Sequence, residues 1–344
     1  MSKILVTGGT GYIGSHTVVE LQEAGYTPVI VDNLSNSSAG VLKQIAKISG
    51  IEPDFHQFDL ADERLVREFV AQHPDISGVI HFAAYKAVGE SVAQPLKYYH
   101  NNFYSLINLL NAYSERPVNF VFSSSCTVYG QPDVLPVTEA APVKQAESPY
   151  GNTKQIAEEI LSETAGAYPN YNIISLRYFN PVGAHASALI GELPIGIPQN
   201  LVPFITQSAI GKRGPITVYG SDYDTSDGSA VRDYIHVVDL AKAHVAAIKL
   251  LEKGNPAGNY DVFNVGTGRG NSVLEVIRAF EDATGVKLNF QIGERRAGDI
   301  EKVWGDVSKS AAQLGWKAER SIEDMMRSAW QWEQYIKDNP LASE

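Results

Sequence analysis

Short apolar runs and longer amphipathic stretches alternate along the first half of the chain. The apolar runs cover residues 4–7, 28–32, 79–82, 120–124 and 173–177, and each ends in polar or small residues. Such runs are typical of strands buried on both faces, as in a parallel sheet. The stretches between them have helical spacing and cover 15–24, 64–72, 96–114 and 150–167. This alternation predicts a doubly wound α/β fold with right-handed crossovers.

The regularity fades after about residue 180. Residues 181–228 are rich in Gly, Pro, Asn and Ser, which indicates irregular loops that face a ligand. Helical patterns return at 238–251, 272–284 and 321–337. We therefore expect a first domain at 1–180 and a smaller mixed α/β domain at 181–344. Some later segments, such as 232–250, are expected to pack back on the first domain.

Composition narrows the classes of function. The 344 residues carry 28 Lys and Arg against 39 Asp and Glu, a net charge of −11, which disfavours nucleic acid and anionic membranes as partners. No segment approaches the ~18 consecutive apolar residues of a membrane span, and no secretory signal is evident, so we expect a cytoplasmic protein. The single cysteine, Cys126, excludes an internal disulfide. His100, His185 and His236 lack metal-ligand spacing, and we predict no metal site.

A glycine-rich turn follows the first apolar run. Gly8, Gly11 and Gly14 stand between the predicted strand and helix. In a Rossmann-type fold, such glycines let backbone amides approach a pyrophosphate at the positive end of the helix. Asp32 ends the next strand, where a carboxylate accepts hydrogen bonds from a ribose 2′-hydroxyl and repels a 2′-phosphate. A strand, glycines, a helix, a second strand and a terminal acid in this order favour binding of NAD over NADP. A glycine motif alone would also fit a turn that binds no ligand.

Tyr150 and Lys154 share one face of a predicted helix, with Ser148 as its N-cap and Pro149 at its first position. A free tyrosine, with a pKa of ~10, is a poor base at neutral pH. A nearby ammonium group and the positive nicotinamide ring favour the phenolate, and a pKa of ~7 requires about 4 kcal/mol. The alternative is a surface pair without chemistry, which is common on helices.

Serines end the strand predicted at 120–124, where the nicotinamide end of the cofactor is expected. A serine hydroxyl at this place can bind a substrate hydroxyl and pass its proton to Tyr150. Such serines can also merely cap a turn. Asp59 has two interpretations as well, since it can hold the adenine edge or cap the end of a strand.

Together these features resemble the extended short-chain dehydrogenase/reductase family. The segments 81–91, 176–185, 231–237 and 295–299 are similar to those of UDP-glucose 4-epimerases, and the similarity extends from residue 3 to about residue 332. The resemblance implies a general acid/base at Tyr150, a cation at Lys154 that holds the nicotinamide ribose and tunes Tyr150, and a proton relay at Ser125. It also implies tightly bound NAD on these residues: Gly8, Gly11, Tyr12, Ile13, Gly14, Asp32, Asn33, Leu34, Ser35, Asn36, Ser37, Asp59, Leu60, Phe82, Ala83, Ala84, Tyr85, Lys86, Asn101, Ser125, Tyr150, Lys154 and Phe179.

The resemblance further implies a substrate and a reaction. A UDP-hexose is expected on Lys86, Ser125, Tyr150, Tyr178, Asn180, Asn200, Leu201, Tyr219, Arg232, Arg296, Asp299 and Val303. Two arginines suit a diphosphate, and a carboxylate suits a ribose hydroxyl. The implied reaction is reversible C4 epimerisation of UDP-galactose and UDP-glucose through a 4-keto intermediate. Residues 1–180 would then bind NAD, and residues 181–344 the nucleotide sugar.

Val303 departs from the pattern of this family. Members restricted to simple hexoses tend to carry tyrosine at the matching position, and members that accept N-acetylated sugars carry a smaller residue. The hypothesis is that this chain also interconverts UDP-GlcNAc and UDP-GalNAc. The alternative is that another side chain fills the space.

Other functions and the assembly stay open at this point. A 4,6-dehydratase or decarboxylase needs acid–base residues where Cys126 and Thr127 stand. A non-catalytic NAD sensor usually lacks the tyrosine that Tyr150 supplies. The family also implies a homodimer that pairs helices 96–114 and 150–167. The candidate contact residues, which can equally face the protein's own sheet, are Leu106, Leu109, Leu110, Ile156, Ile160 and Leu161.

Overall fold

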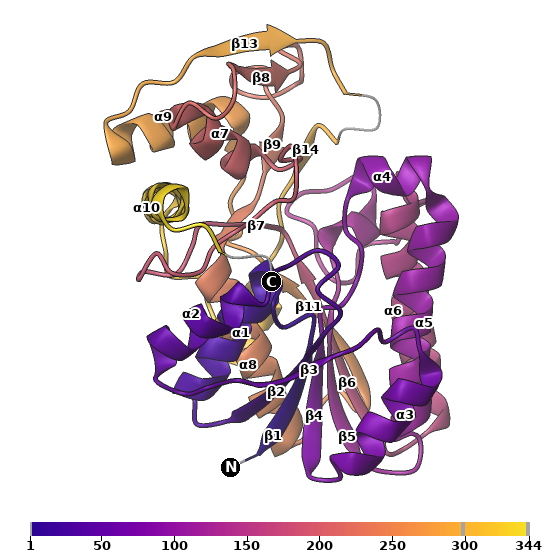
Figure 1. The fold of residues 1–344 in the computed structure, drawn as a ribbon. Helices are drawn as coiled ribbons and strands as arrows, with labels where there is room; N and C mark the ends of the chain where they lie inside the picture. Colours follow the sequence, from indigo (N-terminus) through magenta and orange to yellow (C-terminus); the bar gives the residue numbers. More distant parts are fainter. Residues whose placement is uncertain (1, 297–299, 342–344) are drawn as a thin grey trace.

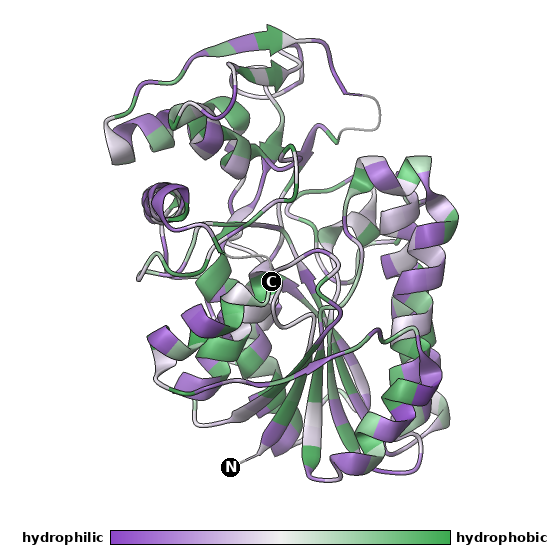
Figure 2. Cartoon of the chain, in the orientation of Figure 1, coloured by the Kyte–Doolittle hydropathy of each residue, from purple (hydrophilic) through white to green (hydrophobic). Residues whose placement is uncertain are grey.

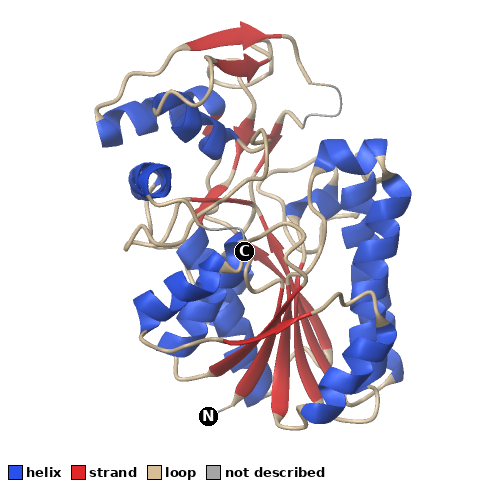
Figure 3. Ribbon diagram, viewed as in Figure 1, coloured by secondary structure: helices blue, strands red, loops and turns tan. Residues whose placement is uncertain are grey.

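A computed structural model describes residues 2–296 and 300–341. Its centre is a sheet of seven parallel strands in the order β11-β6-β5-β4-β1-β2-β3 (Figures 1 and 3). The strands are β1 (Lys3–Thr7), β2 (Thr27–Asp32), β3 (Asp54–Gln57), β4 (Ile76–His81), β5 (Val118–Ser123), β6 (Tyr171–Tyr178) and β11 (Tyr260–Val265). The predicted doubly wound α/β fold is confirmed, and every strand expected from an apolar run is present.

Helices cover both faces of the sheet (Figure 1). One face carries α1 (Tyr12–Glu23), α2 (Gly40–Ser49) and α8 (Val237–Lys253), and the other carries α3 (Glu63–Gln72), α5 (Pro95–Tyr113) and α6 (Pro149–Ala167). Along β1, Ile4 and Val6 belong to the core under the first helix layer, whereas Leu5 belongs to the core under the second. Successive side chains of a strand point to opposite faces. Burial of both faces therefore explains why the runs lack polar alternation, and Figure 2 shows apolar residues concentrated on these strands.

The sequence analysis missed two strands of this sheet. The edge strand β3 is half-exposed and reads Asp-Phe-His-Gln, so it contains no apolar run. At the other edge, Asp261 and Asn264 interrupt the apolar residues of β11. Both signals are weak because an edge strand has only one neighbouring strand and less surface to bury.

The leucines proposed for a dimer contact belong mainly to the protein's own core. Leu106, Leu109, Leu110 and Leu161 are buried between α5, α6 and the sheet. Of the two alternatives for these four residues, the structure supports burial against the protein's own sheet, because their side chains are turned toward the strands. Ile156 and Ile160 are half-buried.

A second lobe lies beyond the carboxyl ends of the strands (Figure 1). It contains α7 (Leu201–Ala209), α9 (Val273–Thr284) and α10 (Ile322–Asp338), which share a hydrophobic core of their own. Its short strands form three small sheets: β7 (Asn180–Val182) with β10 (Tyr234–His236), β9 (Val231–Arg232) with β12 (Asn271–Ser272) and β14 (Lys302–Val303), and β8 (Ile216–Tyr219) with β13 (Phe290–Gly293). Helix α8 packs on α1, and β11 joins the large sheet, although both follow residue 180. The division at residue 180 stays a prediction.

The strand order reverses at β1, which has β2 on one side and β4 on the other. Ligands of doubly wound sheets bind in the crevice outside the carboxyl ends of the strands at this reversal. Here the two strand ends are joined by a hydrogen bond of 2.8 Å between Thr7 Oγ1 and His81 Nδ1. In the part of the chain that the structure describes, no helix is both long and apolar enough to span a membrane.

Candidate active site

The glycine turn after β1 forms a close backbone cradle at this crevice. Gly8 has a φ of +70°, a conformation that favours glycine. A Cβ on Gly14 would lie only 2.2 Å from the carbonyl oxygen of Gly8. The N-terminus of α1 begins after Gly11, and no side chain caps it. The uncapped amides and the helix dipole therefore fit the pyrophosphate of a dinucleotide.

The loops after β2 and β3 meet beside this turn. The Asp32 carboxylate accepts hydrogen bonds from the backbone N–H of Thr10 at 3.2 Å and of Leu34 at 2.9 Å. Asn33 Nδ2 donates to Asp59 Oδ2 at 3.1 Å. The structure thus brings Asp32, Asn33 and Asp59 together at one side of the cradle. This arrangement fits the ribose and adenine of NAD.

Other predicted cofactor residues lie around the same crevice. Ser37 shares a hydrogen bond of 2.7 Å with the Thr10 hydroxyl. The backbone N–H of Phe82 donates to Thr7 O at 3.1 Å, which fixes the start of the segment after β4. The side chain of Leu60 is buried and packs in the core.

Helix α6 begins as predicted, with Ser148 as N-cap and Pro149 in the first turn. The Ser148 hydroxyl accepts a hydrogen bond from Gly151 N at 3.1 Å. This helix buries both Tyr150 and Lys154, which are 6% and 5% exposed. Lys154 Nζ donates to the backbone oxygen of Ser123 at 2.7 Å. The helix start thus places the predicted acid/base pair against the end of β5.

The serine segment after β5 leads into a turn that packs against α6. Ser125 is buried and caps the 3₁₀ turn η1 (Cys126–Tyr129), because its hydroxyl accepts a hydrogen bond from Thr127 N at 3.2 Å. The same hydroxyl also interacts with the Tyr150 phenol. Ser125 therefore caps a turn and faces the phenol at once, so the two interpretations of this serine are compatible.

Burial dominates the protonation of the catalytic pair. It raises the pKa of Tyr150 well above its usual value, while the Ser125 side chain opposes this rise. Burial also lowers the pKa of Lys154 to about 8. The protein alone therefore does not lower the pKa of the Tyr150 phenol as the sequence analysis expected. The phenolate needs the Lys154 charge together with the positive nicotinamide ring of bound NAD.

On the substrate side, the predicted residues come from separate elements. Asn180 begins β7 and donates its backbone N–H to Asp233 O at 2.9 Å. The Arg296 guanidinium stacks on the Tyr219 ring at 4.1 Å, and this ring is 39% exposed. Arg232 Nη1 donates to Val231 O at 2.9 Å. Leu201 begins α7, and Asp299 lies outside the described residues.

Two acidic residues that the sequence analysis did not single out belong to this region. Glu192 lies between two predicted substrate residues, with Oε1 at 3.5 Å from Lys86 Nζ and 2.7 Å from Asn200 Nδ2. It lies in an irregular loop, which gives no periodic signal. Glu158 lies one helical turn after Lys154 on α6, and nothing in the sequence marks it apart from this spacing.

Val303 packs in an apolar cluster that also contains Tyr129 and Phe179. It is 3% exposed, so a larger side chain at this position would require its neighbours to move. Phe179 is likewise buried, and it lies close enough to Gly305 to exclude a Cβ there. The described residues contain no group of three or more His, Cys, Asp or Glu side chains that could hold a metal.

Comparison with known proteins gives consistent matches over almost the whole chain. A sequence model of the NAD dependent epimerase/dehydratase family matches residues 4–266. A UDP-glucose 4-epimerase from Dictyostelium discoideum is 51% identical over 332 residues, which are 96% of this chain and 95% of the relative.

Two solved structures share the fold closely. UDP-glucose-4-epimerase from Stenotrophomonas maltophila, with bound NAD and formylated UDP-arabinopyranose, has a TM-score of 0.94 and 47% identity over 98% of this chain and 100% of that one. The enzyme from Bifidobacterium longum, in complex with NAD+ and UDP, has a TM-score of 0.92 and 47% identity over 98% of this chain and 99% of that one.

Proposed function

The chain belongs to the NAD dependent epimerase/dehydratase family, and on this premise we propose that it interconverts UDP-galactose and UDP-glucose by inverting C4 of the hexose. One observation carries the proposal. Tyr150 and Lys154 are buried on α6, Lys154 Nζ donates to Ser123 O at the end of β5, and Ser125 caps the turn that follows this strand. The 51% identity to a UDP-glucose 4-epimerase over nearly the full length supports the same reaction.

The protein's own residues would perform the proton transfer. Tyr150 takes the proton of the 4-hydroxyl, and Ser125 relays it, since its hydroxyl already interacts with the phenol. Lys154 is buried beside them and supplies a positive charge that favours the phenolate. NAD, when bound, accepts the C4 hydride and returns it. The 4-keto sugar must present its opposite face before that return, which requires a pocket that holds the nucleotide firmly and the hexose loosely.

The nucleotide anchors lie on the second lobe. Arg232 and Arg296 suit the diphosphate, and Asn180 and Asn200 suit its sugar side, as the family resemblance implies. The exposed Tyr219 ring beneath Arg296 provides a flat surface for the uracil or the guanidinium. In this assignment residues 1–180 hold NAD, and residues 181–344 hold the nucleotide sugar.

The replacement Tyr150→Phe tests the assignment of the base. The purified parent, supplied with UDP-galactose and no added NAD, should form UDP-glucose, which chromatography of the nucleotides detects. The variant should lose turnover by at least ~1000-fold while it keeps bound NAD and affinity for UDP. Near-normal turnover by Tyr150→Phe would refute the assignment. A parent that stays silent even with added NAD would favour a dehydratase, a decarboxylase or a sensor.

We also propose that the enzyme accepts UDP-GlcNAc and UDP-GalNAc. The small side chain of Val303 is the basis, since a tyrosine there would bring a ring toward the sugar. Val303→Tyr should abolish turnover of the acetylated pair and keep that of the simple hexoses. Absence of any acetylated product from the parent would contradict the idea. Because Val303 is buried, the thermal midpoint of the variant must be measured as a control.

The last proposal concerns assembly and location: a cytoplasmic homodimer. Exposed apolar side chains gather on α4 (Val88–Ala93) and α5, and they are Val88, Val92, Leu96, Tyr104 and Ile107. Apolar patches of this kind mark contact surfaces. Light scattering should give twice the chain mass for the parent and a lower mass for Leu96→Glu/Ile107→Glu. Val134→Glu, another exposed position, is the matched control. A monomeric parent would contradict the dimer.

A further inference from the structure

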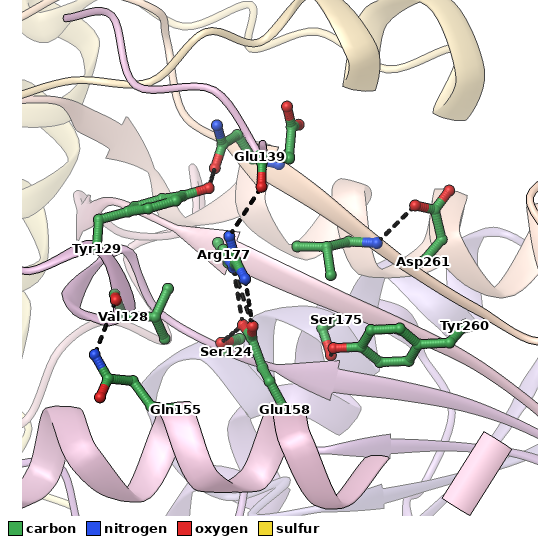
Figure 4. Close-up of polar contacts among 12 residues, drawn as sticks. Ser124, Val128, Tyr129, Glu139, Gln155, Glu158, Ser175, Arg177, Tyr260 and Asp261 are labelled. Atoms are coloured by element: carbon green, nitrogen blue, oxygen red, sulfur yellow. Dashed lines mark hydrogen bonds and ion pairs between the residues drawn. The ribbon is translucent and has the colours of Figure 1, made fainter. Parts of the chain in front are cut away.

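A buried ion pair joins Glu158 of α6 to Arg177 of β6 (Figure 4). Glu158 of α6 and Arg177 of β6 expose only 8% and 7% of their side chains. Arg177 Nε lies 3.0 and 3.1 Å from the two carboxylate oxygens, and Arg177 Nη2 lies 2.6 Å from Oε2. Burying two charges costs several kcal/mol that their attraction often only offsets, so stability alone explains such a pair poorly.

The pair is connected to the serine turn of the active site. Ser124 Oγ donates to Glu158 Oε1 at 2.5 Å, and Ser124 is fully buried. Ser124 directly precedes Ser125, whose hydroxyl faces the Tyr150 phenol. A hydrogen bond to a charged, buried acceptor is among the strong ones in proteins. It fixes the chain at the residue before the relay serine, and Figure 4 shows the bond between Ser124 and Glu158.

The pair is connected to the catalytic lysine as well. Lys154 precedes Glu158 by one helical turn, so the two side chains leave α6 on the same face. Burial opposes a charge on Lys154, and the Glu158 carboxylate acts in the other direction. Arg177 cannot replace this effect, because it contributes a positive charge. One carboxylate thus acts on both the lysine and the serine that directly precedes the relay serine.

We propose that Glu158 is a positioning residue of the epimerase site, which keeps Lys154 protonated and fixes the Ser124–Ser125 turn, while Arg177 holds the carboxylate in place. This role rests on the proposed function, since it acts through the acid/base pair. Glu158 does not touch the substrate in this scheme. Its loss therefore changes the pH range of catalysis, whereas a merely structural role would change stability alone.

Three neighbouring groups, one beside Lys154 and two beside the ion pair, keep their protonation state over the useful pH range, as does Arg177 itself. Burial lowers the pKa of His81, on β4, to about 3 and raises that of Tyr129, on η1, to about 12. The pKa of Tyr260, on β11, is raised as well, and that of Arg177 is raised by Glu158. Between about pH 6 and pH 10, these four groups therefore do not titrate.

The sign of the effect follows from the charges. Lys154 must be protonated to favour the phenolate, and burial lowers its pKa to about 8, so loss of this proton produces an alkaline limb in the activity profile. Removing the Glu158 carboxylate lowers this pKa further, and Arg177 is not among the groups that shift it, so removal of both charges keeps this sign. Lys154 then loses its proton at a lower pH, and the alkaline limb of kcat moves to lower pH.

The test uses the full-length enzyme with its retained NAD. Glu158→Gln/Arg177→Met removes both charges, so that no unpaired guanidinium stays buried, and the glutamine oxygen still accepts from Ser124. We expect the alkaline limb of kcat for UDP-galactose to move down by at least half a pH unit. The matched control is Glu333→Gln/Lys212→Met, which removes another buried carboxylate, on α10, and its lysine partner at 2.7 Å in the turn after α7. The alkaline limb of kcat in this control variant should not move.

A second variant keeps the proposal testable if the double variant does not fold. Ser124→Ala retains both charges and removes only the hydrogen bond to Glu158. We expect a fall in kcat of about tenfold with an unchanged limb, because only the turn is loosened. If the parent is active, either of two results overturns the positioning role. One is an alkaline limb of the double variant at the same pH as in the parent, and the other is an unchanged kcat of Ser124→Ala. An inactive parent overturns the proposed function itself, so the two failures are distinguishable.

Discussion

Replacing Gly14 by alanine should separate the cofactor site from the rest of the fold. Gly14 lies in the first turn of α1, where an added Cβ would be 2.2 Å from Gly8 O, 2.8 Å from Gly9 Cα and 3.0 Å from Gly8 C. These neighbours are backbone atoms of the cradle itself. They cannot rotate away as a flexible side chain does, so the turn must move as a unit.

The size of that movement follows from the contact distances. Ordinary contacts of a Cβ begin at 3.4 Å, so the cradle has to open by about 1 Å. A misplacement of ~1 Å at a binding group costs about 100-fold, which corresponds to about 2.7 kcal/mol. The expected result is a variant that folds but no longer retains NAD through purification. Added NAD should restore part of the turnover, at concentrations about 100-fold above those that the parent needs.

The assay measures nucleotide released from the denatured protein and turnover of UDP-galactose against added NAD. Gly166→Ala is the matched control, since Gly166 lies on α6 with no heavy atom within 4 Å of an added Cβ. A helical Gly→Ala change without clashes stabilises by ~0.5–1 kcal/mol, so this control should keep NAD and unfold at the same temperature or higher. Full retention of NAD by Gly14→Ala would refute the reasoning about the cradle.

Three further predictions concern stability and reactivity. Four histidines are buried with pKa values lowered to about 3 or about 4 by burial, and they are His16, His81, His236 and His244. The stability that these neutral histidines contribute to the fold is complete above pH ~6.5 and is lost as pH falls toward their pKa values, by at most about 1.4 kcal/mol per pH unit for each. The urea midpoint should therefore fall steeply from pH 7 to pH 5. A flat profile would contradict this. Burial raises the pKa of Cys126 to about 12, so iodoacetamide at pH 8 should alkylate the native protein at least ~100-fold more slowly than the urea-unfolded chain, and Cys126→Ala should keep turnover. Leu109→Ala should lower the free energy of unfolding by ~2–5 kcal/mol, whereas the exposed Val134→Ala should change it by less than ~0.5 kcal/mol in the same denaturant titration.

The sequence determined the features that depend on neighbours in the chain. Strands buried on both faces need unbroken apolar runs, and five of the seven strands of the large sheet follow from these runs. The glycine spacing of Gly8, Gly11 and Gly14 and the N-cap at Ser148 are local backbone requirements, and the structure has them where they were expected. Each of these signals lies within a few residues, so no knowledge of distant contacts is needed.

Only the tertiary structure decided how distant segments meet. The direction of a helix face depends on which layer covers it, and for this reason Leu106 and Leu109 belong to the core rather than to a contact between subunits. The ion pair between Glu158 and Arg177 joins a helix to a strand, and the two residues are 19 positions apart in the chain. Neither residue by itself indicates a role in the site. The protonation of Tyr150 is likewise set by burial, since the energy of a charge depends on everything that surrounds it in space.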